Sequence, residues 1–460
     1  MLIIRSERVA LPDGLRPASV HIIDGRIVGI ASHRERSTGV RDLDVGALVV
    51  LPGLVDTHVH INDPGRADWE GFDSATRAAA AGGVTTLVDM PLNSIPPTTT
   101  LAGLHAKRDA ANGRCHVDVG FWGGVVSGNA AELGPLAQAG VLGFKCFLSP
   151  SGVPEFENVT ESDLREALPI LARLGLPLLV HAELPALLRD PAGRQAGRSE
   201  GRESLQADPR SYRTWLESRP IEAEVAAIEL MIRLAREHGA RVHVVHLATA
   251  AALPLFSTAR RDGVAITVET CPHYLTFAAE EIPDRSPAFK CAPPIREHRE
   301  RESLWRGLAA GEIDLVASDH SPSPPAMKHL DDGDYVRAWG GIASLQLGLA
   351  ALWTGMSTRG VPIERLADWL ARVPAALAGF DRLKGAIAVG HDADLVVWDP
   401  DATWTVDGAS LFHRHPVTPY HGARLRGRVK TTFLKGEVVF DRGEIVGPPR
   451  GRLLSRQPPD

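Results

Sequence analysis

The chain contains, at residues 51–60, the stretch Leu51-Pro52-Gly53-Leu54-Val55-Asp56-Thr57-His58-Val59-His60. This stretch begins as a short apolar run, which is typical of a buried β-strand, and it ends in two histidines one residue apart. Residues two apart on a strand point to the same side, so both imidazoles can reach one metal ion. The stretch therefore predicts a buried strand with a metal-binding end.

Seven further apolar runs follow this one, each with a helix-like stretch after it. The eight runs lie at residues 54–56, 84–88, 116–119, 141–144, 176–180, 241–245, 265–268 and 313–317. Eight such units with nearly continuous apolar strands predict a (β/α)8 TIM barrel, of the α/β class, over residues 51–385. A doubly wound sheet is the alternative, but no run leads into a GxGxxG turn. In the first connecting stretch, Asp68 is the expected N-cap of an Ala-rich helix and Gly82-Gly83 its stop.

The two ends of the chain show short strands and tight turns instead. Asp24-Gly25 separates two strand-like runs near one end, and Lys435-Gly436 separates two near the other. Turn residues between such runs predict β-hairpins. We expect residues 1–50 and 386–455 to form together one small β-sandwich domain beside the barrel.

The composition is that of an ordinary globular protein, with 44% hydrophobic residues, 23% charged residues and a net charge of −6. We expect no nucleic-acid partner, because no basic patch or tail is present. We also expect no membrane segment, because no apolar stretch approaches the roughly 20 residues that span a bilayer. The first residues lack the layout of a signal peptide, and the four scattered cysteines form no CxxC pair. These features predict a cytoplasmic protein.

Catalytic groups of such a barrel lie at the C-terminal ends of its strands. A single histidine at a strand end is usually a core or surface residue, and a single lysine is usually a surface residue. Here several such residues gather at one barrel edge, and this joint placement predicts a two-metal site. The candidate ligands are His58, His60, Lys145, His181, His246 and Asp319.

Lys145 needs a separate argument, because divalent cations would repel a protonated lysine. Burial lowers the pKa of a lysine and so supplies the neutral amine. That amine can capture carbon dioxide and become a carbamate (N6-carboxylysine), an anionic ligand with two oxygens. We therefore hypothesise that the Lys145 carbamate bridges two metal ions.

The same hypothesis divides the remaining ligands between the two metals. One metal takes His58, His60 and Asp319, the other takes His181 and His246, and a hydroxide joins the carbamate as a bridge. Zinc suits these ligands, with iron, cobalt and manganese as alternatives. Two metals generate hydroxide near neutral pH, and Asp319 is expected to act as general base and then general acid.

Three further histidines compete for these roles. His243 lies in the same run as His246, but we prefer His246 because it ends the run. His320 follows Asp319 directly and is expected to point away from the metals, with an indirect or substrate-binding role. His273 is expected to be structural.

These residues and their flanks resemble the cyclic amidohydrolases, which are the dihydroorotases, the hydantoinases (dihydropyrimidinases) and the allantoinases. The resemblance covers nearly the whole chain, and the whole group shares the segment 51–60. Asp63 departs from the pattern, because we expect a glutamate there in allantoinases. Other segments are similar specifically to allantoinases; they are residues 61–66, 69–72, 89–98, 144–148, 151–153, 269–275, 289–296, 318–322 and 338–342.

The resemblance implies that the chain opens the hydantoin ring of (S)-allantoin to give allantoate during purine breakdown. It also implies the two-metal site, the carboxylated Lys145 and a homotetramer. Substrate contacts are implied near Asn62, Asn93, Cys291 and Gly340, partly through backbone groups.

Two enzyme alternatives and one further class stay open. Dihydroorotases usually place an arginine just after the two histidines to hold the substrate carboxylate, whereas this chain has the neutral Asn62 there. Arg66 is expected to be a loop residue, not an anion site. A hydantoinase opens the same ring with another substituent and is harder to exclude. A non-catalytic scaffold is disfavoured, because all six candidate ligands are present.

Overall fold

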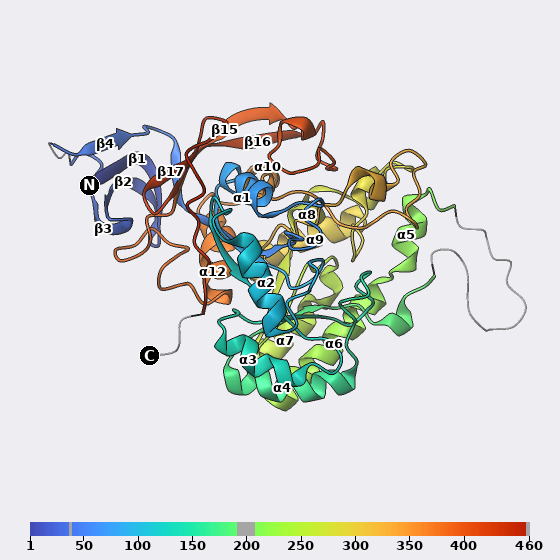
Figure 1. Cartoon of the computed structure of the whole chain (residues 1–460). Helices are drawn as coiled ribbons and strands as arrows, with labels where there is room; N and C mark the ends of the chain where they lie inside the picture. The colour runs from blue at the N-terminus through green and yellow to red at the C-terminus, as the bar shows by residue number, and fades with distance from the viewer. Residues whose placement is uncertain (36–38, 191–207, 457–460) are drawn as a thin grey trace, which may run out of the picture.

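The computed structural model describes residues 1–35, 39–190 and 208–456. It consists of a barrel of parallel strands ringed by helices and a separate sheet built from both ends of the chain (Figure 1). Strands from the two ends of the chain, blue and red in Figure 1, belong to that one sheet.

The terminal sheet has nine strands, and backbone hydrogen bonds join all of them. Its order is β18-β17-β16-β15-β5-β1-β2-β3, with β4 paired to β1. The antiparallel pairing of β15 with β5 joins the two ends of the chain. The strands are β1 (Leu2–Leu11), β2 (Gly14–Ile23), β3 (Arg26–Ala31), β4 (Arg41–Asp44), β5 (Val49–Pro52), β15 (Leu395–Thr405), β16 (Arg424–Leu434), β17 (Glu437–Asp441) and β18 (Glu444–Ile445).

Both expected hairpins are confirmed. Asp24 and Gly25 connect β2 to β3 with φ values of 49° and 78°, and Lys435 and Gly436 connect β16 to β17 with φ values of 49° and 76°. Two consecutive positive φ values match the twist of the flanking strands, and glycine adopts the second without a steric penalty. The terminal strands thus form a unit of their own, although the division at residues 50 and 386 stays a prediction.

The barrel consists of eight parallel strands. β8 and β9 are two parts of one of them, separated only by Trp122. A parallel bridge between Val59 and His320 joins the first strand to the segment after the last, which closes the barrel. The strands are β6 (Leu54–Val59), β7 (Val84–Asp89), β8 (Asp118–Phe121) with β9 (Gly123–Gly124), β10 (Phe144–Phe147), β11 (Leu178–His181), β12 (Val242–Val244), β13 (Ile266–Thr270) and β14 (Leu315–Val316).

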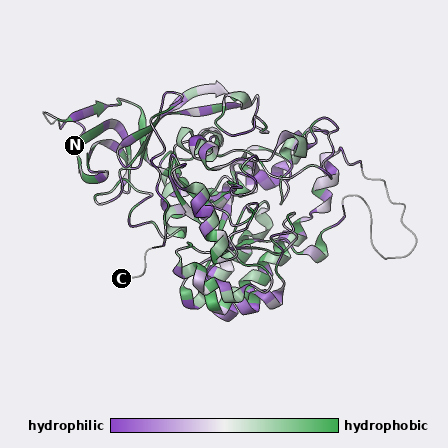
Figure 2. Cartoon of the chain, viewed as in Figure 1, coloured by the Kyte–Doolittle hydropathy of each residue, from purple (hydrophilic) through white to green (hydrophobic). Residues whose placement is uncertain are grey.

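Helices surround the barrel and carry hydrophobic and hydrophilic residues in alternation along their ribbons (Figure 2). Such helices bury their apolar side against the strands and expose the other to water. The helices are α1 (Phe72–Ala81), α2 (Leu101–Ala111), α3 (Leu133–Gln138), α4 (Glu161–Leu174), α5 (Tyr212–Ser218), α6 (Ile221–His238), α7 (Leu253–Arg261), α8 (Pro272–Thr276), α9 (His298–Ala310), α10 (Gly348–Arg359), α11 (Arg365–Ala367) and α12 (Val373–Leu377).

The start of α1 differs from the expectation that Asp68 would cap it. The helix begins at Phe72, and its N-cap is Gly71, with φ 95° and ψ 158°. Glu70 is the reason, because its carboxylate turns into the core to accept the backbone N–H of Arg414 at 3.2 Å. A turn at residues 67–69, in which the N–H of Trp69 donates to the carbonyl of Arg66 at 2.9 Å, lies before Gly71. The expected stop at Gly82 is confirmed.

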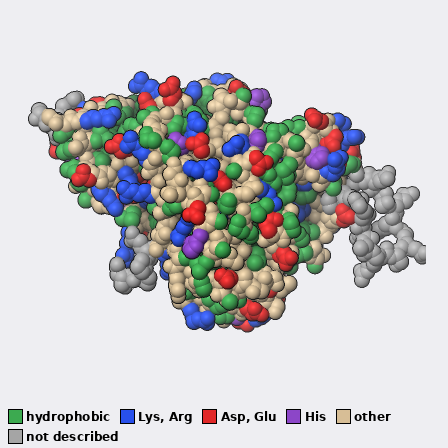
Figure 3. Space-filling model, viewed as in Figure 1, with side chains coloured by type: hydrophobic (Ala, Val, Ile, Leu, Met, Phe, Trp, Pro, Cys, Tyr) green, Lys and Arg blue, Asp and Glu red, His purple; other side chains and the backbone are tan. Residues whose placement is uncertain are grey.

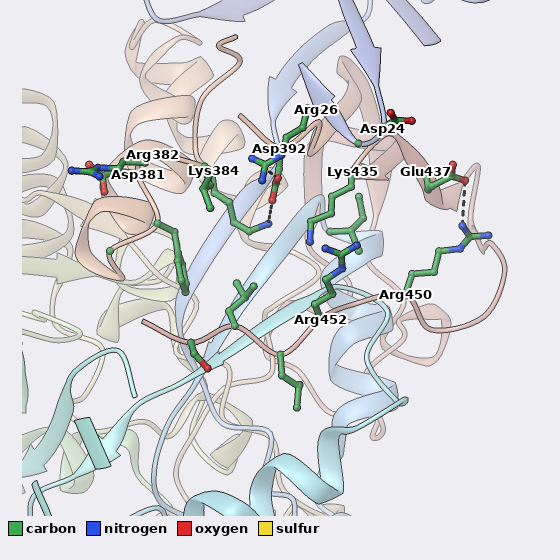
Figure 4. A pocket seen from close by; sticks show the side chains of 18 residues that line it. Asp24, Arg26, Asp381, Arg382, Lys384, Asp392, Lys435, Glu437, Arg450 and Arg452 are labelled. Carbon is green, nitrogen blue, oxygen red and sulfur yellow. Dashed lines mark hydrogen bonds and ion pairs between the residues drawn. The ribbon is translucent and has the colours of Figure 1, made fainter. Parts of the chain in front are cut away.

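The junction between the terminal sheet and the barrel holds a buried group of charges. The Nζ atom of Lys384 lies 2.6 Å from Asp394, 2.9 Å from Asp118 and 3.2 Å from Asp392. Asp118 begins strand β8 and Asp394 directly precedes β15, so Lys384 connects the two parts. Figure 4 shows the adjoining cavity of about 930 Å³, in which the ammonium of Lys384 points to Asp392.

The face of the molecule in Figure 3 carries acidic and basic side chains intermixed, without a patch of one sign. None of the helices in the described part of the chain is long and apolar enough to cross a lipid bilayer.

Candidate active site

The six candidate ligands gather at the C-terminal ends of the barrel strands, as the sequence predicts. All six are buried. Two of them, His246 and Asp319, have left-handed backbones with φ values of 43° and 45°. Such strain costs about 1–3 kcal/mol for a residue other than glycine and is common at functional sites. The ligands come from five elements: His58 and His60 from the end of β6, Lys145 from β10, His181 from β11, His246 from the segment after β12, and Asp319 from the segment after β14.

The first group consists of His58, His60 and Asp319. Oδ1 of Asp319 lies 3.2 Å from Nε2 of His58 and 3.6 Å from Nε2 of His60. The potential ligand atoms of the three residues all lie within 4.8 Å of one another. This is the donor set and the spacing that a divalent metal ion requires.

Glu269 fixes the orientation of His58 in this group. Its Oε1 lies 2.5 Å from Nδ1 of His58, and its Oε2 lies 3.0 Å from Nε2 of His243. Burial raises the pKa of the Glu269 carboxyl, but His58 and His243 outweigh this effect and hold the pKa below its usual range. A carboxylate at Nδ1 keeps the proton there, so Nε2 presents a lone pair toward Asp319. Two electron-rich atoms facing each other fit a cation between them.

The second group consists of His181 and His246. Nδ1 of His181 lies 3.0 Å from Nε2 of His246, while Nε2 of His181 contacts Glu183 at 2.7 Å. Burial lowers the pKa of His181 to about 4 and that of His246 well below its ordinary value. Both imidazoles are therefore neutral, which is the form that binds metals.

Lys145 lies between the two groups. Its side chain is completely buried, and Nζ has no hydrogen-bond partner among the described residues. Burial lowers its pKa to about 8. Burial is also the largest cause of the low pKa values of His60 and His246, and the charge of Lys145 lowers both further. A buried amine without a partner is costly, so the position fits a modified lysine better than an ammonium ion.

Two of the competing histidines, His243 and His320, have other hydrogen-bond partners. Nδ1 of His243 contacts the hydroxyl of Thr267 at 2.8 Å. His320 accepts the backbone N–H of Ser344 at 3.2 Å, and its Nε2 lies 3.5 Å from Glu70. Its ring therefore points away from the ligand groups. His273 is buried beside Tyr274, with a ring-centroid distance of 4.2 Å. Neither of its ring nitrogens has a hydrogen-bond partner among the described residues, and its potential ligand atom lies within 4.8 Å of those of Cys271 and Asp319.

The ligand groups form the floor of a cavity of about 370 Å³. Asn93, Cys291 and Gly340 line it, as the resemblance implies, and Nδ2 of Asn93 lies 3.4 Å from Nδ1 of His60. Asn62 does not line the cavity, because its side chain is buried and its Nδ2 donates to the carbonyl of Pro322. The cavity wall also includes the segment 336–341.

Each cationic side chain on the cavity wall already has a partner. Arg219 pairs with Glu183 at 2.9 Å, and Arg337 pairs with Asp332 at 3.2 Å. Lys290 donates to the carbonyl of Ala338 at 2.6 Å. Outside the wall, Arg66 pairs with Glu155 and donates to the carbonyl of Asn93, which fits the expected loop role. The described part of the wall thus offers no unengaged cation to a substrate carboxylate.

Sequence reasoning did not assign a role to Glu269 or Glu183. Glu269 directly follows the seventh apolar run, so the strand-end rule that found the ligands also points to it. Glu183 lies two residues after His181 and carries no comparable signal, because its contact depends on the fold of the loop.

The larger cavity of Figure 4 lies at the start of β8, at the opposite end of the strands from the ligand groups. Asp118, Asp392 and Asp394 lie close enough together there for a metal ion, but the ammonium of Lys384 contacts all three. This cluster is therefore a structural ion-pair group.

Comparison with known proteins agrees with the fold. The Amidohydrolase family model matches residues 49–439, which include the barrel and all six candidate ligands. The chain therefore belongs to the amidohydrolase family.

Within this family the chain is similar to allantoinases. It is 50% identical to "Allantoinase" of Streptomyces avermitilis over 99% of both chains. It is 44% identical to "Allantoinase" of Arabidopsis thaliana over 98% of this chain and 90% of the relative. Among solved structures, "L-Hydantoinase (Dihydropyrimidinase) from Arthrobacter aurescens" matches with a TM-score of 0.92 and 30% identity, over 99% of this chain and 100% of that one.

Proposed function

We propose that the protein is an allantoinase, which hydrolyses the ring amide of (S)-allantoin to allantoate in purine breakdown. The observation that carries this proposal is a cavity with two groups of metal ligands at its floor and only engaged cations on its wall. Allantoin is a neutral ureide, so it needs hydrogen-bond donors and acceptors but no free cation. The near full-length similarity to allantoinases supports the same substrate.

The residues present fit two divalent metal ions. We propose that His58, His60 and Asp319 hold one and that His181 and His246 hold the other, with zinc as the preferred metal. The unpartnered amine of Lys145 supports a carbamate as the ligand shared between them. When bound, the ions would lower the pKa of the attacking water and polarise the ring carbonyl.

Asp319 is placed to move the proton of this reaction. Water supplies the new C–O bond, the ring C–N bond breaks, and the proton passes from the water to the leaving nitrogen through the carboxylate. The hydroxyl of Ser321 donates to Oδ1 of Asp319 at 2.9 Å and so holds the carboxylate in place. Burial raises the pKa of Asp319, which makes it a better base than an exposed carboxylate.

Glu269 and Glu183 act through the histidines that they contact. Glu269 accepts a hydrogen bond from the protonated ring nitrogen of His58, and Glu183 accepts one from that of His181. The other nitrogen of each imidazole is then available to a metal. The substrate itself would meet Asn93, Cys291 and Gly340 on the cavity wall. Asn62 lies behind that wall, so we propose for it a role in supporting the loop near Pro322.

A hydantoinase (dihydropyrimidinase) is the second candidate, and the TM-score of 0.92 to an L-hydantoinase favours it. A substrate panel separates the two. Metal-loaded protein is assayed with allantoin, 5-alkylhydantoins, dihydrouracil and dihydroorotate, with Asp319→Asn as the inactive control. Allantoin is expected to have the highest kcat/KM. A higher value for a 5-alkylhydantoin would favour the second candidate.

We also propose a homotetramer in the cytoplasm. Four buried free cysteines fit a reducing compartment. Light scattering of the purified protein measures the subunit number, and a monomer would contradict the tetramer.

A further inference from the structure

The segment 336–341 forms one side of the active-site cavity but belongs to no helix or strand. Its backbone groups therefore have no regular ladder to satisfy them. Buried carbonyls and N–H groups need partners, and an unmet one costs about as much as a lost hydrogen bond. The partners of this segment show how the cavity wall is held.

Lys328 supports the second half of the segment. It ends a short helix, Pro325–Lys328, and its side chain is almost completely buried. Its Nζ donates to the carbonyls of Gly341 at 2.5 Å and Trp339 at 3.2 Å. Lys328 is not among the residues that line the cavity, so it acts on the segment from behind.

Lys290 supports the first half in the same way. Its Nζ donates to the carbonyls of Ala338 at 2.6 Å and Val336 at 3.2 Å. It lies 4.2 Å from the ring centroid of Trp215, and its own carbonyl accepts the N–H of Gly341 at 2.8 Å. Two buried lysines thus engage four carbonyls of one six-residue segment.

Gly340 differs from its neighbours in this segment because its backbone N–H and carbonyl both lack a hydrogen-bond partner among the described residues. The N–H of Trp339 donates to Met327 at 2.7 Å, and that of Ala338 donates to Asp334 at 3.0 Å. A Cβ on Gly340 would meet only the carbonyl of Lys290 at 3.9 Å and Cα of Cys291 at 4.0 Å, so space remains around this peptide.

We propose that Lys328 and Lys290 are positioning residues for substrate recognition, because they hold segment 336–341 so that the Gly340 peptide faces the ureide. This inference rests on the proposed function, since it names what the wall of that site recognises. Burial lowers the pKa of Lys328 to about 7 and that of Lys290 to about 8. Burying two amines beside one loop is energetically unfavourable. In return, their hydrogen bonds hold the loop that forms the substrate wall in one conformation.

The test replaces Lys328 by methionine, which keeps an unbranched side chain and removes the donors. Lys384→Met is the matched control, because Lys384 is equally buried but lies at the opposite end of the barrel. The readouts are kcat and KM for allantoin, hydrogen–deuterium exchange of residues 336–341, and zinc content. Lys328→Met is expected to raise KM about tenfold and to change kcat by less than about threefold. It is also expected to speed exchange in the segment with zinc content unchanged, whereas Lys384→Met leaves KM and this exchange as in the wild type.

Unchanged KM and unchanged exchange in metal-loaded Lys328→Met would overturn the inference. Lys328→Gln provides a second variant if the first does not fold, because its amide keeps two N–H donors on a shorter stem. It is expected to give a smaller rise in KM, and no rise would again overturn the proposal. If the wild type does not turn over allantoin, the proposed function fails, while the exchange of residues 336–341 still tests the two lysines.

Discussion

Oε1 of Glu269 lies 2.5 Å from Nδ1 of His58, and both side chains are buried below the cavity. The two residues come from the seventh and the first strand of the barrel. Through this contact, the orientation of His58, a proposed metal ligand, depends on a carboxylate that would not itself touch a metal.

Glu269→Gln tests this relationship. The amide can accept a hydrogen bond from Nδ1 but loses the charge that stabilises the proton there, so we expect zinc affinity to fall about 10–100-fold. Competition with a chelator measures the affinity. Glu70→Gln is the control, because Glu70 is an equally buried carboxylate beside His320, which is not a ligand. Equal zinc affinity in Glu269→Gln and the wild type would refute the role.

Lys145→Ala and Lys145→Arg test the carbamate. Neither variant can form it, and arginine keeps the positive charge, so both are expected to lose bound metal and activity. Elemental analysis gives the metal content, and a ¹³C carbamate signal after incubation with labelled bicarbonate tests the wild type directly. Activity in either variant at the wild-type level would rule out the bridging role.

Gly340→Ala tests the substrate wall. The protein has room for the added methyl group, since its nearest atoms lie at 3.9 Å and beyond, but the methyl would occupy space next to the substrate. We expect substrate binding to weaken by about 1–3 kcal/mol with little change in melting temperature. Gly348→Ala, whose Cβ also meets its nearest atom at 3.9 Å, is the control outside the cavity. A wild-type KM in Gly340→Ala would contradict the placement.

Lys384→Met tests the junction between the barrel and the terminal sheet. The variant leaves the buried Asp394 without its cation, whereas Asp118 keeps Lys435 at 3.0 Å and Asp392 keeps Arg26 at 2.9 Å. We therefore expect a loss of about 3 kcal/mol in the free energy of unfolding at pH 7. Denaturant titration measures this loss.

The pH dependence of that loss has a definite sign. In the wild type, burial raises the pKa of Asp118, but Lys384 and Lys435 outweigh burial and lower it. Its contribution is therefore present above the ordinary value of 3.8 and is lost as the pH falls through the lowered value. Without Lys384, burial and mutual repulsion raise the carboxyl pKa values, so protonation stabilises the variant. The difference between variant and wild type should shrink from pH 7 to pH 5, and a larger difference at pH 5 would contradict this account.

The barrel and the gathering of the candidate ligands at one edge could be predicted because both depend on local patterns. Apolar runs mark the strands, and parallel strands bring their C-terminal ends to one edge, which places His58 and Asp319 3.2 Å apart. The turn residues of both hairpins, such as Asp24 and Gly25, carry their own backbone preference.

Other features depend on contacts between distant parts of the chain. Glu70 turns inward because the backbone N–H of Arg414 lies beside it. The helix α1 therefore begins at Phe72 and not directly after Asp68. The lysines that support segment 336–341 donate to backbone carbonyls, which no side-chain pattern reveals. The place of Asn62 behind the wall likewise follows from its contact with Pro322.

The central claim is that this cavity hydrolyses a neutral ureide on two metals. The most direct measurement is the kcat/KM of the zinc-loaded wild type for allantoin beside dihydroorotate and a 5-alkylhydantoin, with metal content determined on the same sample. The account predicts two metal ions per chain and the highest kcat/KM for allantoin. Protein that holds two metal ions but does not turn over allantoin would contradict it.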